Sequence, residues 1–164
     1  MNSSFITTVV CGSVDDGKST IIGRLLVESG SVPLDHVEQA RKIRRTGSLI
    51  PAGEIDYSLL TDGLESEREQ GITIDVAFRQ METPTGKRIN FADSPGHEQY
   101  TRNMVVAASG ADISLLIVDA TRGPRPQTIR HATVCSLMGV KNLIVAINKI
   151  DLVNYSQDVF NQIV

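Results

Sequence analysis

The sequence predicts an α/β fold with a doubly wound, mainly parallel sheet. Three observations indicate this fold class: nearly continuous aliphatic runs, helical repeats of apolar residues between them, and a glycine-bearing loop that joins the first run to the first helical segment. The chain has 164 residues, of which 41% are apolar and 21% charged, a length and composition typical of one globular domain. We therefore expect a single domain over residues 1–164.

The expected elements alternate along the chain. Predicted strands cover 6–11, 74–82, 87–92, 113–118 and 142–147, and predicted helices cover 19–29, 34–44, 58–69, 98–108, 128–138 and 156–164. The turn sequence Thr83-Pro84-Thr85-Gly86 predicts an antiparallel hairpin at one sheet edge. The aliphatic runs 113–118 and 142–147 are typical of central parallel strands that helices cover on both faces.

Composition excludes several classes of partner. The net charge is −3 and the pI about 5.6, without the basic excess that binding to nucleic acid phosphates requires. No apolar stretch approaches the roughly 18 residues of a membrane span. The two cysteines, Cys11 and Cys135, lie in apolar contexts and are expected to be buried free thiols, as in a reducing compartment. We expect a cytoplasmic protein that binds neither nucleic acid nor membranes.

A phosphate-binding loop follows the first predicted strand. Residues 12–19 match G-x-x-x-x-G-K-[ST] and directly precede a predicted helix, so chance occurrence as a glycine-rich turn is disfavoured. Gly12 and Gly17 allow the backbone to approach phosphates, Lys18 is expected to reach the β- and γ-phosphates, and Ser19 is expected to bind Mg²⁺. The expected nucleotide contacts are Gly12, Ser13, Val14, Asp15, Asp16, Gly17, Lys18, Ser19 and Thr20.

A second motif, Asp93-Ser94-Pro95-Gly96-His97, follows the third predicted strand. A carboxylate at that strand end would face the phosphates, where Asp93 is expected to hold a Mg²⁺-bound water. Gly96 is expected to offer its N–H to the γ-phosphate. His97 is the candidate that orients the attacking water in hydrolysis; the alternative is a solvated histidine at a helix start.

The third motif, Asn148-Lys149-Ile150-Asp151, follows the last aliphatic run and indicates the base. Guanine presents donors at N1 and N2 that one carboxylate accepts together, so Asp151 would select guanine over adenine. Asn148 is expected to touch the guanine edge and to tether the phosphate loop. The aliphatic stem of Lys149 is expected to cover the base. Thr73 is expected to supply a second Mg²⁺ ligand and to act in catalysis when the γ-phosphate orders its loop, unless it is an ordinary threonine at a strand entry.

These motifs resemble those of translation-factor-type GTPases. The matching blocks are G-S-V-D-D-G-K-S-T at 12–20, E-R-E-Q-G-I-T-I-D-V-A at 67–77 and D-S-P-G-H-E-Q-Y-T-R-N-M at 93–104. Within that class the chain resembles the large, GTPase subunit of bacterial sulfate adenylyltransferase; Asp16 stands where elongation factors usually have histidine, and the block D-Y-S-L-L-T-D-G-L at 56–64 also matches. The resemblance implies a P-loop GTPase fold, GTP/GDP and Mg²⁺ as cofactors, and a smaller catalytic partner subunit that joins ATP and sulfate into adenosine 5'-phosphosulfate while GTP hydrolysis drives that step.

The chain departs from this pattern in three places. Ser94 replaces the usual threonine, and the loop Gly123-Pro124-Arg125-Pro126 has an unusual double proline. The Ser-Ala motif that closes the guanine pocket in this family does not occur before Val164. We therefore expect a nucleotide domain truncated at its C-terminus, with β-barrel domains following in the intact protein. Two alternatives stay open: a translation factor that binds aminoacyl-tRNA, and a paralogue that modifies another sulfated metabolite.

Overall fold

The computed structural model describes residues 5–43, 51, 53–61 and 75–164. In this part of the chain one five-stranded sheet has the order β2-β3-β1-β4-β5. Its strands are β1 (Phe5–Gly12), β2 (Ala77–Glu82), β3 (Arg88–Asp93), β4 (Ile113–Asp119) and β5 (Asn142–Asn148). All neighbouring pairs are parallel except β2 and β3. The mainly parallel sheet with one antiparallel edge hairpin is therefore confirmed.

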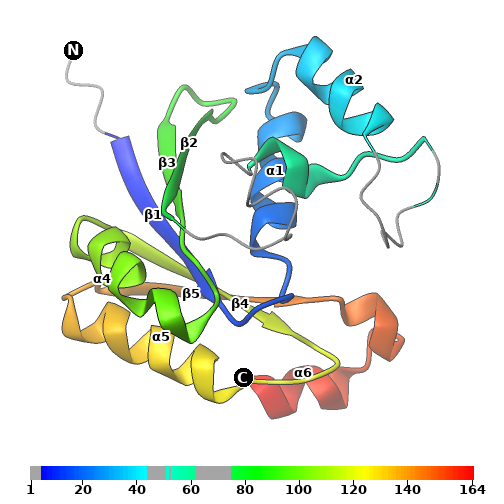
Figure 1. The fold of residues 1–164 in the computed structure, drawn as a ribbon. Helices are drawn as coiled ribbons and strands as arrows, with labels where there is room; N and C mark the ends of the chain where they lie inside the picture. Colours follow the sequence, from blue (N-terminus) through cyan, green and yellow to red (C-terminus); the bar gives the residue numbers. More distant parts are fainter. Residues whose placement is uncertain (1–4, 44–50, 52, 62–74) are drawn as a thin grey trace.

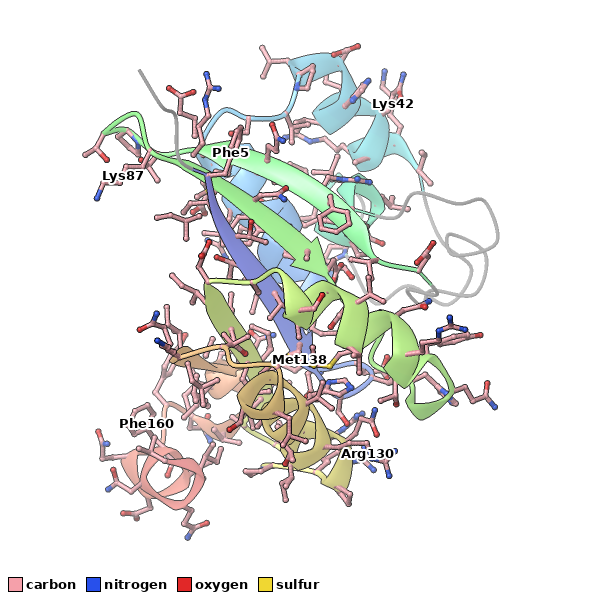
Figure 2. The ribbon with its side chains drawn as sticks, turned by 90° about the vertical axis from the view of Figure 1, so that its left-hand side faces the viewer. Phe5, Lys42, Lys87, Arg130, Met138 and Phe160 are labelled. Atoms are coloured by element: carbon pink, nitrogen blue, oxygen red, sulfur yellow. The ribbon has the colours of Figure 1, made fainter. Side chains whose placement is uncertain are left out.

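Helices cover both faces of the sheet. Within the described ranges the α-helices are α1 (Lys18–Glu28), α2 (Leu34–Lys42), α4 (Thr101–Ser109), α5 (Pro126–Leu137) and α6 (Gln157–Ile163), and the short 3₁₀ helices are η1 (Tyr57–Leu60), η2 (Glu98–Tyr100) and η3 (Ile150–Val153). Helices α4 and α5 lie side by side on one face, while α1 lies on the other with α2 beyond it (Figure 1). Lys42 on α2 and Phe160 on α6 lie at opposite ends of the molecule (Figure 2).

The core is divided by the pleat of the central strands. Alternate residues of a strand point to opposite faces. Val9 and Cys11 of β1 therefore join the cluster beneath α4 and α5, whereas Val10 joins Ile22 and Leu26 of α1. Burying both faces of β1 fixes its register between β3 and β4. This strand ends in the loop that leads to α1, so the core determines where the loop starts.

Strand β5 is the last strand in the sheet that the described residues form. Leu143, Ile144 and Val145 on this strand are 53%, 52% and 44% exposed. The aliphatic run 142–147 is the pattern of a strand covered on both faces, and the central position that it indicates stays a prediction.

Other boundaries differ by a few residues. The predicted helix 98–108 starts as the 3₁₀ turn η2 and becomes α-helical from Thr101. Of the predicted helix 58–69, the described part is η1, and residues 62–74 lie outside the described residues. Both cysteines are buried free thiols, as expected. Among the described helices, none has the length and apolar character that crossing a bilayer requires.

Candidate phosphate and guanine site

The candidate site lies where four strands end at the same edge of the sheet. Strands β1, β3, β4 and β5 run parallel, so their carboxyl ends meet there. The residues at those ends are Gly12, Asp93, Asp119 and Asn148. In open α/β sheets ligands bind in this position, outside the carboxyl ends of the strands. The fold thus brings together motifs that are more than a hundred positions apart in the sequence.

The phosphate loop depends on two glycines. Gly12 has φ 147° and Gly17 has φ 93°, both in the region that L side chains rarely adopt. A Cβ on Gly17 would also collide with the side-chain amide of Asn148. Helix α1 begins at the next residue, Lys18, so its first N–H groups and its positive dipole end face the loop. This conformation has the features of an anion-binding site.

Lys18 is enclosed by the loop that precedes it. Its side chain is buried, and Nζ donates hydrogen bonds to the carbonyl oxygens of Ser13 at 2.7 Å and Gly12 at 3.3 Å. Burial lowers the pKa of Lys18, and the carboxylates of Asp93 and Asp16 oppose that shift. The structure therefore places the ammonium group beside the loop. Its contact with the β- and γ-phosphates stays a prediction.

Ser19 and Asp93 form the candidate Mg²⁺ position. Ser19 Oγ donates to Asp93 Oδ2 at 2.8 Å, although the two residues are 74 positions apart. A hydroxyl and a carboxylate are the hard oxygen ligands that Mg²⁺ prefers, and Mg²⁺ usually completes its shell with water and phosphate oxygens. The described residues contain no group of three His, Cys, Asp or Glu side chains that could hold a metal by themselves. The donor set therefore fits a Mg²⁺ ion that shares its coordination with a nucleotide.

Gly96 brings the second motif against the phosphate loop. A Cβ there would lie 2.5 Å from Lys18 Nζ and 3.0 Å from the backbone nitrogen of Val14, so a side chain at this position would require Lys18 and the phosphate loop to shift. Ser94 Oγ donates to the carbonyl of Val10 at 2.6 Å and fixes the start of the same segment. The serine thus supplies the hydroxyl that this position uses, although it departs from the usual threonine.

His97 is half-buried and turned toward its own helix start. Its Nδ1 accepts a hydrogen bond from the Gln99 N–H at 3.4 Å, and its ring lies 6.1 Å from that of Tyr100. The proposed role of His97 in orienting water stays a prediction. The other candidate from the sequence, Thr73, lies outside the described residues.

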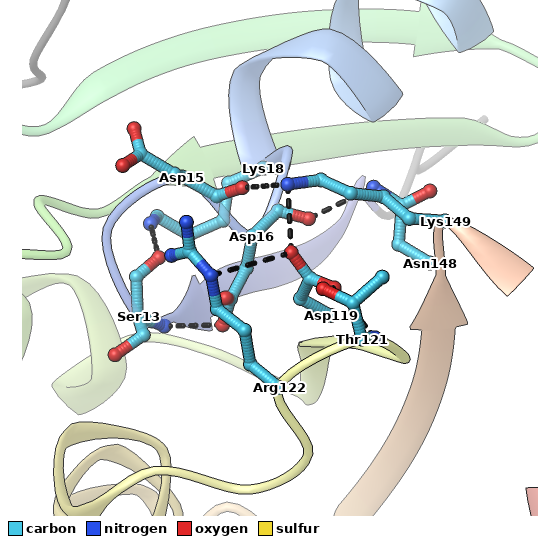
Figure 3. Close-up of polar contacts among 9 residues, drawn as sticks. All are labelled: Ser13, Asp15, Asp16, Lys18, Asp119, Thr121, Arg122, Asn148 and Lys149. Carbon is cyan, nitrogen blue, oxygen red and sulfur yellow. Dashed lines mark hydrogen bonds and ion pairs between the residues drawn. The ribbon is translucent and has the colours of Figure 1, made fainter. Parts of the chain in front are cut away.

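The guanine motif is bonded directly to the phosphate loop (Figure 3). Asn148 Nδ2 donates to the carbonyl of Asp16 at 2.8 Å, which confirms the predicted tether. Lys149 Nζ donates to the carbonyl of Asp15 at 2.6 Å. Asp151 lies in the first turn of η3, two positions after Lys149 in the sequence. The placement of all three agrees with a guanine pocket beside the phosphates, and base recognition by Asp151 stays a prediction.

Asp119 is a site residue that the sequence reasoning missed. Its carboxylate is 1% exposed, and Oδ2 accepts a hydrogen bond from Lys149 Nζ at 2.7 Å. Thr121 donates to Oδ1 through its N–H at 2.8 Å and its hydroxyl at 2.6 Å. Burial raises the pKa of Asp119, but these hydrogen bonds from Lys149 and Thr121 outweigh it, so the pKa is lowered. The position of Asp119 directly after an aliphatic strand, like that of Asp93, is the signal that could have revealed it.

Asp16 closes the loop on itself. Its Oδ2 accepts a hydrogen bond from the Ser13 N–H at 2.7 Å, while its side chain is 2% exposed. Burial raises the pKa of Asp16, and the Ser13 N–H opposes that shift. Asp15 and Thr20, in contrast, have exposed side chains. The Asp16 carboxylate is therefore held inside the loop, while the Asp15 and Thr20 side chains face solvent.

Comparison with known proteins agrees with this arrangement. The chain is 50% identical over 163 residues to sulfate adenylyltransferase subunit 1 of Aliarcobacter butzleri (strain RM4018), covering 99% of this chain and 34% of the relative. It is 57% identical over 152 residues to the bifunctional enzyme NodQ of Azospirillum brasilense, covering 93% of this chain and 24% of the relative. The chain thus spans about a third or less of the length of these relatives.

Among solved structures, the bacterial selenocysteine-specific elongation factor EF-Sec matches with a TM-score of 0.70 and 29% identity, over 97% of this chain and 22% of that chain. The family model described as the elongation factor Tu GTP binding domain matches residues 3–164. That match includes the phosphate loop, the Asp93 motif and the guanine motif. The chain therefore belongs to the elongation factor Tu GTP-binding domain family.

Proposed function

We propose that this chain is the GTP-hydrolysing domain of a sulfate adenylyltransferase GTPase subunit. The observation that carries the proposal is the 50% identity, over 99% of the chain, to a relative of that name. The structural match to an elongation factor has 29% identity, which favours the sulfate-activating role over the delivery of aminoacyl-tRNA. In this role GTP hydrolysis drives the formation of adenosine 5'-phosphosulfate and pyrophosphate from ATP and sulfate by a separate, smaller catalytic subunit in the cytoplasm.

The roles of individual residues follow from their positions. The N–H groups from the loop and the start of α1 would bind the phosphates together with Lys18, and Ser19, Asp93 and Thr73 would hold Mg²⁺. A bound Mg²⁺ neutralises charge on the phosphate oxygens. His97 would orient the attacking water, as a positioned side chain does in this reaction class. Asn148, Lys149 and Asp151 would bind the guanine, with Asp151 accepting from N1 and N2.

The experiment is reconstitution of the intact protein with the partner that co-purifies with it. We expect a small adenylyl-transferring subunit, and pyrophosphate release from ATP and sulfate that rises on addition of GTP and not on addition of GDP. Co-purification with ribosomes or tRNA instead would favour the translation factor. Pyrophosphate release that is independent of GTP would contradict the coupling.

A second candidate has its own support. The 57% identical relative is described as a bifunctional enzyme, so this domain can belong to a chain that carries a second enzymatic part. The mass of the intact polypeptide distinguishes the two. A bifunctional chain would be long enough to carry a second catalytic domain, and limited proteolysis would separate that domain from the GTP-binding part.

A further inference from the structure

The first two N–H groups of the phosphate loop, those of Gly12 and Ser13, both donate hydrogen bonds to side chains of the protein. The Ser13 N–H donates to Asp16 of the same loop. The Gly12 N–H donates instead to Nδ1 of His131 at 3.2 Å, across 119 positions of sequence. His131 lies in the middle of α5, a helix that the nucleotide motifs do not include. No feature of the sequence marked this histidine.

The surroundings of His131 keep its ring neutral. The side chain is 0% exposed. Burial, together with the positive charges of Lys18 and Arg130, lowers the pKa of His131 to about 4. Because Nδ1 accepts, the ring proton is on Nε2. The Gln127 atom nearest to Nε2 is the amide nitrogen, at 2.9 Å, while Gln127 Oε1 accepts from Arg130 at 3.3 Å, so the Gln127 amide has to turn over to accept the ring proton. The lone pair on Nδ1 is therefore available to the Gly12 amide at neutral pH.

The backbone at Gly12 is so closely packed that it has little room to move. A Cβ on this residue would lie 2.5 Å from the carbonyl oxygen of Ile117 and 3.3 Å from Asp16 Oδ2, so its backbone is packed between β4 and the loop. An unpartnered N–H in such a position is destabilising, since water cannot replace the lost acceptor. The peptide would rotate to find one, and the amides that follow it would move with it.

We propose that His131 is a positioning residue for nucleotide binding. It holds the Gly12 amide from α5 and thereby keeps the phosphate loop in the shape that accepts phosphates before the nucleotide arrives. Preorganisation of this kind increases affinity because the loop does not have to be ordered on binding. The inference rests on the proposed GTP-binding role of the loop.

Substitutions of His131 can test whether the hydrogen-bond acceptor or only the volume of the side chain matters. His131→Asn places an oxygen near the position of Nδ1, whereas His131→Leu fills the space without an acceptor. His131→Gln, whose polar end reaches the position of Nε2, is a second variant without an acceptor at the required place. Cys135→Ala is the matched control, because Cys135 is buried one turn further along the same face of α5 and belongs to the core.

The measurement is calorimetric titration of each intact variant with GTP and GDP, together with its melting temperature and hydrogen exchange at the Gly12 amide. We expect His131→Leu and His131→Gln to bind both nucleotides about tenfold more weakly and to exchange the Gly12 amide faster, with binding restored to within about threefold in His131→Asn. Cys135→Ala should lower the melting temperature while leaving affinity unchanged.

Equal affinities of His131→Leu, His131→Gln and the wild type would overturn the role of His131 and leave the proposed function intact. Weakened binding in Cys135→Ala to the same extent as in His131→Leu would also overturn it, because general damage to the core would then account for the loss. A wild type that does not bind GTP would overturn the proposed function itself.

Discussion

Removing the ammonium group of Lys149 tests the connection between the guanine motif and the phosphate loop. Lys149→Met keeps the aliphatic stem that is predicted to cover the base and removes the hydrogen bonds to the Asp15 carbonyl and to Asp119. A hydrogen bond to a charged group contributes about 1.5–3 kcal/mol. The lysine side chain is 29% exposed, so solvent screens the pair and the lower part of that range applies.

We therefore expect Lys149→Met to weaken GDP binding by about 2 kcal/mol, roughly 30-fold. The assay is calorimetric titration of the intact protein. Lys141→Met, which removes an exposed lysine just before β5, controls for the loss of one positive charge.

A double-mutant cycle with Asp119→Asn then isolates the pair. The amide side chain of this variant would keep an oxygen for Thr121 but lose the charge that faces Lys149. The coupling between the two substitutions should be about 1–2 kcal/mol, as for residues in direct contact. Effects that add to within about 0.5 kcal/mol would refute the reasoning, because the two side chains would then act independently.

Three further predictions concern single residues. His97→Ala should keep GTP affinity and lose most GTP hydrolysis, since a water-orienting side chain acts on the chemical step; unchanged turnover in a phosphate-release assay would exclude that role. Asp151→Asn should shift the nucleotide preference from GTP toward xanthosine triphosphate, which carries an oxygen where guanine has its N2 amine, and competition binding would show it. Because the pKa of His131 is lowered from 6.5 to about 4, its neutral form stabilises the folded state above pH 6.5, and this stability is lost as the pH falls from 6.5 toward 4. Wild type should therefore lose about 2 kcal/mol more than His131→Asn between pH 7 and 4.5 in denaturant unfolding, and equal losses would contradict the buried neutral ring.

The phosphate loop was the part of the site most readable from sequence. Gly12, Gly17 and Lys18 occupy positions where backbone geometry and charge allow few residue types. Their spacing in the sequence therefore predicts the conformation of the loop. Constraints of this kind act within a few residues and leave a local signature in the chain.

The contacts of Asp119 and His131 were not readable in this way. Asp119 acquires its role only because β4 and β5 are parallel neighbours, which brings Lys149 within 2.7 Å. These are consequences of strand order and helix packing.

By itself the sequence determined the fold class, the phosphate loop and the guanine motif, because these depend on periodicity and on residues close together in the chain. The sequence also predicted that Asn148 tethers the phosphate loop, whereas only the tertiary structure decided that Lys149 is hydrogen-bonded to this loop and that His131 accepts from its first amide. Those contacts join residues that are 119 to 134 positions apart, and packing alone brings such distant groups within hydrogen-bonding distance.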